Sequence, residues 1–264
     1  MMSNKHTFHI VDQSPWPLIN SLNIMNMMNI TLMMLKSQFK INNLMIMIYF
    51  LITILSLTLW WRDILRESSF QGHHTWKVYI SMKISMILFI SSEIMFFLSF
   101  FWSFFWFSLS PEMEIGNSWP PLNICMINPY HLPLMNTMIL LTSGIFVTWC
   151  HFSVMNKNYK KALMSLIITF LLGVLFTSLQ MMEYNWTEFS MNDNSFSSIF
   201  FLATGFHGTH VIIGSLFLLS NINQMMMSQF SQTHHFSLEA AAWYWHFVDV
   251  IWIYLYIFMY WWFF

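Results

Sequence analysis

The chain has 264 residues, of which 57% are hydrophobic, 19% aromatic and 8% charged, and its formal net charge is −1. Soluble domains carry about 25% charged residues, so this composition excludes an ordinary soluble enzyme, a nucleic-acid-binding protein and a disordered chain. The two cysteines, Cys125 and Cys150, are too few for a disulfide framework or a thiolate metal cluster. We therefore expect an integral membrane protein.

Charged residues and loop-forming Asn and Pro divide the chain into long apolar stretches. A helix that crosses the hydrocarbon core needs roughly 20 mostly apolar residues. The stretches predict seven such helices, at about 15–35, 41–66, 76–108, 132–152, 160–183, 195–220 and 236–260. The expected fold is an all-α integral membrane protein, formed as a single polytopic domain over residues 1–264.

The first predicted helix contains Asn20, Asn23, Asn26 and Asn29, which recur every three residues. On an α-helix a three-residue repeat drifts around the surface instead of holding one face. These side chains could contact a partner or cap a polar groove, and compositional bias would give the same pattern.

The distribution of basic residues predicts the orientation in the membrane. Seven basic loop residues fall on the N-terminal side: Lys5, Arg62, Arg66, Lys77, Lys157, Lys160 and Lys161. Only Lys36 and Lys40 fall on the other side, together with the acidic residues Glu112, Glu114, Glu188 and Asp193. By the positive-inside rule, the N-terminus faces the inner compartment, and seven spans then place the C-terminus on the opposite side.

Glu93 is the most informative polar residue within a predicted span. It follows Lys83 by ten residues, roughly 15 Å along a helix, and therefore lies near the middle of the bilayer. A carboxylate there indicates either a proton-exchanging group or a protonated Glu that only bonds to neighbouring helices. No basic residue lies near it in the sequence, so we expect Glu93 to be protonated at neutral pH.

Two pairs of polar residues have helical spacing within predicted spans. They are His207 with His210, and His246 with Asp249. Together with His151 they could hold haem or a metal ion. Hydrogen bonds between helices are the alternative use of the same residues. His234 and His235 have no cysteine partners, so the sequence predicts no zinc site there.

A charged segment, residues 60–74, lies at a predicted membrane edge. Arg66, Glu67 and His74 belong to it, and Arg and His donors suit the phosphates of lipid head groups. The alternative is an ordinary basic loop on the inner side.

Several of these segments together resemble cytochrome c oxidase subunit III of the mitochondrial, insect-like kind. The resemblance covers essentially the whole chain, and the 25 methionines agree with mitochondrial coding. The matching stretches are residues 9–17 (HIVDQSPWP), 60–74 (WWRDILRESSFQGHH), 90–97 (ISSEIMFF), 119–121 (WPP), 203–214 (ATGFHGTHVIIG) and 242–249 (AWYWHFVD).

The resemblance implies an accessory subunit of the proton-pumping oxidase, a translocase, in the mitochondrial inner membrane. The subunit itself holds no metal and no redox centre, because haem a and copper belong to partner subunits. Its helices form a lipid-filled V, with two helices in one arm and five in the other. It flanks catalytic subunit I, supports oxygen access and proton uptake, protects the enzyme during turnover, and can join a respiratory supercomplex.

The resemblance also assigns particular residues. Glu93 matches the intramembrane glutamate of the family, and Arg66, Glu67 and His74 match its lipid-binding region. At Trp106 and Phe152 the family often has His, so a role for those two His positions is in doubt here.

Two other classes of protein remain open from the residues alone. One is an independent proton-coupled transporter or channel that uses Glu93, although the chain has neither an internal repeat nor a pair of broken helices. The other is a membrane cytochrome whose His residues bind haem.

Overall fold

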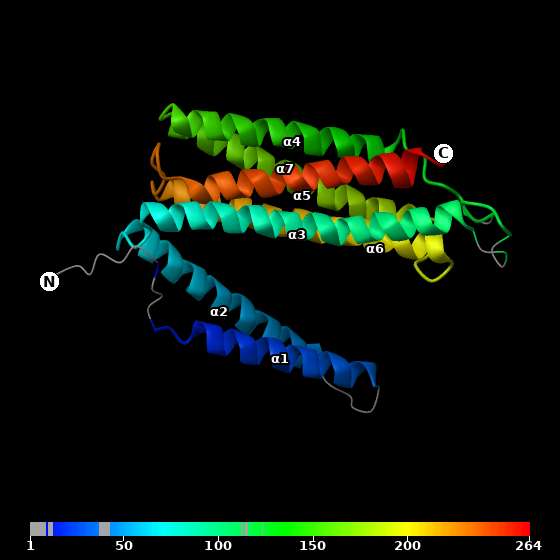
Figure 1. The fold of residues 1–264 in the computed structure, drawn as a ribbon, viewed down its shortest axis with the longest axis horizontal. Coiled ribbons are helices and arrows are strands. Elements are labelled where there is room, and N and C mark those ends of the chain that lie inside the picture. The colour runs from blue at the N-terminus through cyan, green and yellow to red at the C-terminus, as the bar shows by residue number, and fades with distance from the viewer. Residues whose placement is uncertain (1–8, 10–12, 37–42, 112, 114–115, 123) are drawn as a thin grey trace. The chain divides into compact units, whose positions relative to one another are not determined.

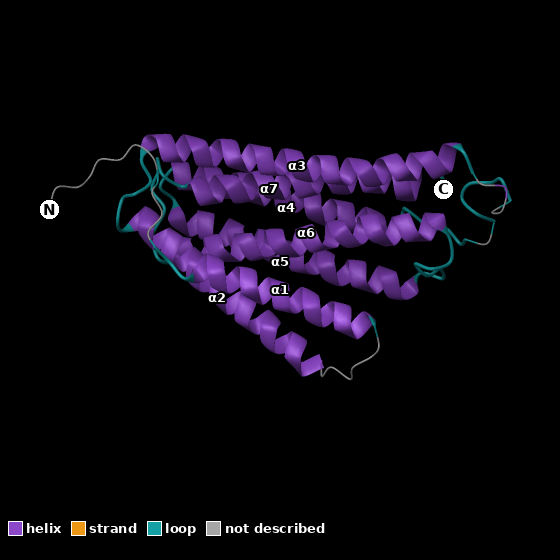
Figure 2. Cartoon of the chain, turned by 60° about the horizontal axis from the view of Figure 1, so that its bottom comes forward, coloured by secondary structure: helices purple, strands orange, loops and turns teal. Residues whose placement is uncertain are grey.

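The computed structural model describes residues 9, 13–36, 43–111, 113, 116–122 and 124–264, so Lys5, Lys40, Glu112 and Glu114 of the charge analysis lie outside the described residues. Within these ranges the chain is helical and has no strand (Figures 1 and 2). The helices are α1 (Trp16–Leu35), α2 (Asn43–Ser69), α3 (Trp76–Leu109), α4 (Leu132–Met155), α5 (Tyr159–Trp186), α6 (Ser195–Met226) and α7 (Phe236–Leu255), and α7 continues into the π-helix η2 (Tyr256–Trp261). The predicted all-α fold is confirmed.

Six helices among the described residues, α2 to α7, are long and apolar enough to cross a membrane. The protein is therefore a multi-pass membrane protein. α1 is not among the six, and its 20 residues include four Asn, which lower its hydropathy. Crossing of the membrane by α1 stays a prediction.

The chain forms two compact units, Met1–Met82 and Lys83–Phe264. Unit 1 contains α1, α2 and the beginning of α3, and unit 2 contains the rest of α3 and the four helices that follow. The lipid-filled V expected from the resemblance stays a prediction.

In unit 1, α1 packs along α2 through a few polar contacts. The Ser56 hydroxyl donates to Asn20 Oδ1 over 2.7 Å, and the Trp16 indole N–H donates to Asp63 over 2.8 Å. Asn20 and Asn23 are buried, whereas Asn29 is exposed. The Asn repeat therefore drifts off the α2 face, and Asn20 at its beginning bonds within the chain.

The centre of unit 2 is Trp245 of α7, which is fully buried. A Cβ atom added to Gly173 of α5 would lie 2.7 Å from the indole ring, and one added to Gly214 of α6 would lie 3.0 Å from it. The indole N–H donates to Ser143 of α4 over 2.8 Å. Two glycines thus form a slot for one ring, which joins three helices to α7.

α6 extends to Met226, beyond the predicted end near residue 220. Its polar last turns contact α7, because the Ser237 hydroxyl lies 2.7 Å from Asn221 Oδ1 and 2.8 Å from Gln224 Oε1 and can donate to either. At its beginning, the Asn194 side chain accepts from the Ser197 N–H, which closes a capping box.

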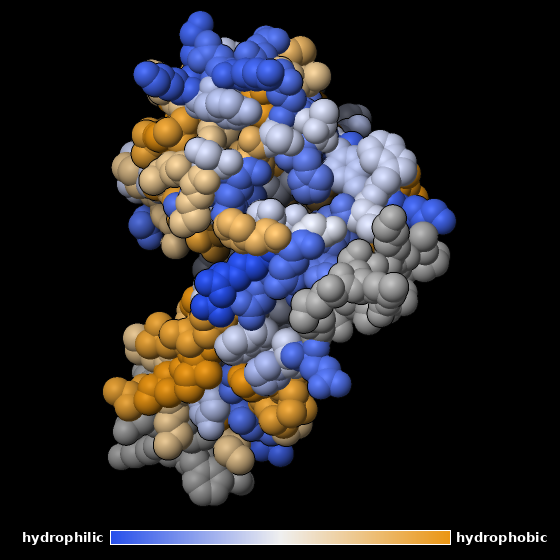
Figure 3. Space-filling model, turned by 90° about the vertical axis from the view of Figure 1, so that its left-hand side faces the viewer, coloured by the Kyte–Doolittle hydropathy of each residue, from blue (hydrophilic) through white to orange (hydrophobic). Residues whose placement is uncertain are grey.

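The loops of unit 2 lie at two opposite ends of the bundle (Figure 1). The α4–α5 turn, the end of α6 and the beginning of α7 are at one end, and the α5–α6 loop and the C-terminus are at the other. Figure 3 looks onto the former end, where many hydrophilic residues gather.

Candidate functional site: polar groups within the helices

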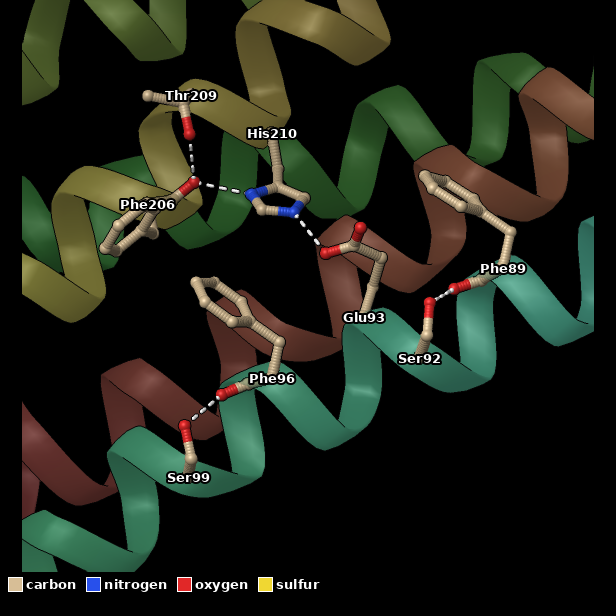
Figure 4. Close-up of polar contacts among 8 residues, drawn as sticks. All are labelled: Phe89, Ser92, Glu93, Phe96, Ser99, Phe206, Thr209 and His210. Carbon is tan, nitrogen blue, oxygen red and sulfur yellow. Dashed lines mark hydrogen bonds and ion pairs between the residues drawn. The ribbon is translucent and has the colours of Figure 1, made fainter. Parts of the chain in front are cut away.

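Glu93 of α3 pairs with His210 of α6. Its Oε2 lies 3.0 Å from His210 Nε2, and Figure 4 shows the two side chains pointing toward one another across the gap between the helices. Glu93 stands near the middle of the 34-residue α3, as the sequence predicts. The expectation of a carboxylate without a basic partner is wrong, because His210 supplies one from 117 residues away.

The second ring nitrogen of His210 determines where the proton of this pair can sit. Nδ1 lies 2.6 Å from the carbonyl oxygen of Phe206, which can only accept, so Nδ1 carries a hydrogen (Figure 4). Nε2 of a neutral ring is then an acceptor, and the Glu93 carboxyl must donate to it. One proton is thus shared between Glu93 Oε2 and His210 Nε2, either as a neutral pair or as an ion pair.

Aromatic rings surround the pair. Phe97 lies edge-on to the imidazole of His210 at 5.0 Å between ring centres, and Tyr244 and Phe247 lie at 6.3 Å. The side chain of Glu93 is 24% exposed, whereas that of His210 is 10% exposed. The carboxyl therefore lies at the border of the bundle, with its partner inside.

His207 is directed away from His210 although both belong to α6. Its Nε2–H donates to the backbone carbonyl of Val248 in α7 over 3.3 Å, and its ring contacts Trp252 and Phe176. Residues three apart on a helix differ by about 60° in direction, enough to face different neighbours. The two histidines therefore do not converge on one ligand.

His246 and Asp249 form a contact within α7 instead of a bond between helices. The His246 Nδ1 and Asp249 Oδ2 atoms are 3.8 Å apart. Both side chains face α4 at Gly144, where an added Cβ would lie 2.8 Å from Asp249 Oδ2. Gly144 thus provides the space that lets these polar groups approach α4.

The sequence pattern did not indicate another polar group within the helices, the buried carboxyl of Glu183 in α5. Its Oε1 accepts from the Tyr260 hydroxyl over 2.6 Å and from the Gln180 amide over 3.3 Å, and Gln180 in turn accepts from Asn136 of α4. All four residues are buried.

Glu183 also lines a cavity of about 300 Å³ whose wall includes Cys125. There, the carboxylate of Glu188 raises the pKa of the Cys125 thiol.

One group of possible metal ligands occurs among the residues that the structure describes: His151, His235 and Glu239. The other polar residues considered as haem or metal ligands, His207, His210, His246 and Asp249, belong to no such group in this part of the chain. The sequence grouped His151 with these residues as possible ligands and predicted no zinc site at His235, whereas the structure places His151 beside His235 and Glu239.

The charged segment of unit 1 is organised around Glu67. Its Oε2 lies 3.1 Å from His9 Nε2, and the His74 ring lies edge-on to His9 at 5.8 Å. Arg66 is exposed on the last turn of α2, and Arg62 pairs with Asp63 over 3.0 Å. The segment therefore combines an exposed guanidinium with a His–Glu contact at one helix end.

Trp106 and Phe152, which stand where the resemblance often has His, are exposed apolar side chains. In a bilayer such side chains suit contact with lipid or with a partner subunit, and neither offers a ligand atom.

Comparison with known proteins gives one consistent result. The family model for cytochrome c oxidase subunit III matches residues 6–264. The chain is 50% identical over 260 residues to cytochrome c oxidase subunit 3 of Locusta migratoria, with 98% of each chain covered. It is 49% identical over 262 residues to that of Pelomedusa subrufa, with 99% of each covered, and 49% identical over 259 residues to that of Drosophila melanogaster, with 98% of each covered.

Proposed function

Because the chain belongs to the cytochrome c oxidase subunit III family, we propose that it is an accessory subunit of the mitochondrial terminal oxidase that takes no direct part in electron transfer. In this role it contacts catalytic subunit I, and haem a and copper reside in the partner subunits. It lies in the inner membrane with its N-terminus in the matrix and its C-terminus in the intermembrane space. The basic residues where α4 connects to α5 support this orientation: Lys157 lies in the turn, and Lys160 and Lys161 lie in the first turn of α5.

The Glu93–His210 pair is the observation that carries the proposed role in proton uptake. The geometry allows a proton to move between Glu93 Oε2 and His210 Nε2 over 3.0 Å without rotation of either side chain. The Phe206 carbonyl keeps the other nitrogen protonated, so the ring cannot turn without losing a bond. We propose that at neutral pH the proton sits on Glu93, since an apolar surrounding favours the neutral pair over two separated charges.

Infrared difference spectroscopy of the oxidase tests the protonation of Glu93. The wild type should show a protonated carboxyl band that Glu93→Gln lacks. Ser92→Ala is the matched control, because the Ser92 hydroxyl donates only to the Phe89 carbonyl one turn back and should leave the band unchanged (Figure 4). If Glu93→Gln instead removes the bands of an ionised carboxylate, the ion pair is the resting form.

Removal of the chain from the oxidase tests the accessory role itself. We expect the haem spectrum to remain essentially intact and early turnover to persist, whereas sustained turnover decays faster because oxygen access, proton uptake and shielding of the catalytic subunit are lost. A loss of haem absorbance in proportion to the chain removed would overturn the proposal. It would indicate that His207, His210 and His246 bind haem.

We also propose that Arg66, Glu67 and His74 hold a phospholipid at the end of α2. The exposed guanidinium of Arg66 would bind the phosphate, and the Glu67–His9 contact fixes the neighbouring ring of His74. Replacement of Arg66 and His74 by Ala should lower the amount of phospholipid that survives purification. Unchanged lipid content would leave this segment as an ordinary basic loop.

The proposed orientation has a direct test in mitoplasts, whose exposed face is that of the intermembrane space. Added protease should cut near residues 112–117 and 188–194. Cleavage restricted to residues 157–161 would show that the chain has the opposite orientation.

A further inference from the structure

Three side chains from two helices face one another at the end of unit 2 where α4 ends and α7 begins. His151 lies in the last turns of α4, His235 is the N-cap residue of α7, and Glu239 follows one turn later. This group is separate from the Glu93–His210 pair and has no part in the function proposed above.

The hydrogen bonds of His235 leave one ring nitrogen directed into the group. Its Nδ1 lies 3.0 Å from the carbonyl oxygen of Ser231, so Nδ1–H donates and Nε2 keeps its lone pair. That lone pair faces His151 Nε2 at 3.3 Å and Glu239 Oε1 at 3.5 Å. A backbone carbonyl on the far nitrogen is the usual device that orients a metal-binding histidine.

The spacing of the ligand atoms matches one particular coordination geometry. Tetrahedral zinc with bonds of about 2.0–2.2 Å separates neighbouring ligand atoms by about 3.3–3.6 Å. The two measured separations, 3.3 Å and 3.5 Å, fall within this interval, and the ligand atoms of all three residues lie within 4.8 Å of one another. Two imidazoles and one carboxylate are also a ligand set that zinc accepts with a fourth position left open.

We propose that His151, His235 and Glu239 form a zinc-class metal-binding site that ties the end of α4 to the beginning of α7. The side chain of His235 is 6% exposed and that of Glu239 is 15% exposed, so the ion would be shielded but reachable from the loop end. The Lys83 ammonium lies 2.7 Å from Glu239 Oε2. It leaves Oε1 to act as the single oxygen ligand, and its like charge weakens binding of the cation.

Zinc titration of the full-length chain in lipid nanodiscs, against a chelator of known affinity, tests the site. The wild type should bind one equivalent, and cobalt in its place should give the intense visible absorption of a four-coordinate ion. His151→Gln and Glu239→Gln should each weaken zinc binding at least ~10-fold. The control is His234→Gln, the exposed neighbour that belongs to no ligand group, and it should bind zinc like the wild type.

Lys83→Met is the decisive variant because it should increase affinity. Removal of the ammonium beside Glu239 should tighten zinc binding several-fold, and a gain of affinity is not produced by misfolding. If wild-type binding equals that of the His151→Gln variant, or if Lys83→Met weakens binding, the three residues form only a hydrogen-bonded contact and the proposal is wrong.

Discussion

Two of the carboxyl groups in the helices of unit 2, those of Glu93 and Glu183, have opposite environments. Glu93 stands in the middle of α3 at the border of the bundle, 24% exposed, with one imidazole as its partner. Glu183 stands near the end of α5, is almost fully buried, and accepts from Tyr260 and Gln180 on the same oxygen. The first has a partner that can exchange a proton, whereas the second has donors that hold it in place.

The comparison shows that depth along a helix and burial inside the protein are different properties. A carboxyl near the middle of the bilayer can lie at the surface of the bundle, where its environment is lipid or a partner subunit. A carboxyl near a membrane edge can be sealed by neighbouring helices. We therefore expect loss of Glu183 to affect stability and loss of Glu93 to affect proton chemistry, and four measurements test this difference.

The largest effect on the free energy of unfolding should come from Glu183→Ala. The substitution leaves the Tyr260 hydroxyl and the Gln180 amide without their acceptor inside the bundle, which should cost about 2–4 kcal/mol. Unfolding of the full-length chain by sodium dodecyl sulfate in mixed micelles measures this. Glu183→Gln is the control, because it keeps an acceptor oxygen and should lose less than half as much.

Tyr260→Phe should have the next largest effect. It removes the 2.6 Å hydrogen bond to Glu183 Oε1 but leaves the ring packed against Phe200 and Trp252. We expect a loss of about 1–2 kcal/mol in the same assay. A loss of stability well above this interval would indicate an ionised Glu183, since hydrogen bonds to charged groups are stronger. No loss of stability would mean that this hydrogen bond does not stabilise the bundle.

Glu93→Gln should change the free energy of unfolding by less than about 1 kcal/mol. The glutamine amide can still donate to His210 Nε2, and the side chain lies at the border of the bundle. The sustained turnover of the oxidase should nevertheless fall, because an amide does not exchange the shared proton. A destabilisation as large as that of Glu183→Ala would mean that Glu93 is a structural group.

The smallest effect on stability should come from Asp193 in the α5–α6 loop. Its exposed carboxylate serves as a reference for the two carboxyl groups within the helices. The Ser190 backbone N–H, 2.6 Å from Asp193, holds the pKa of that carboxyl below its ordinary value of 3.8. A lowered folded-state pKa stabilises the loop above the ordinary value, and this contribution disappears as the pH falls through the folded-state value. Hydrogen exchange of the Ser190 amide should therefore accelerate, after correction for intrinsic rates, as the pH falls below the ordinary carboxyl pKa. Asp193→Asn should remove this pH dependence.

The helices and Glu93 were predictable because both follow from local composition. Long apolar runs between charged or loop-forming residues predict spans, and one charge inside such a run is conspicuous. Glu183 lacked this signal, because it follows directly on the charge-free run 162–182 and looks like the charged end of a span. Its burial depends on Tyr260, which lies 77 residues later.

The partners of the polar residues were not predictable, because spacing along one helix does not specify what lies opposite. His207 and His210 have the spacing of a ligand pair, yet one faces the Val248 carbonyl and the other faces Glu93. His235 offered no zinc motif in the sequence, since its companion His151 comes from α4. Only the packing of α4 against α7 brings these two rings together.

The slot for Trp245 has a consequence for biosynthesis. α7 has the largest buried share of the six candidate spans, 56%, and it is the last of them to leave the ribosome. Until it arrives, Ser143 lacks the indole N–H and the glycine faces of α5 and α6 have no ring between them. We therefore expect the earlier helices to stay incompletely packed in the bilayer until α7 is inserted. Stalled chains that end before Phe236 should crosslink to insertion factors or lipids more readily than completed chains.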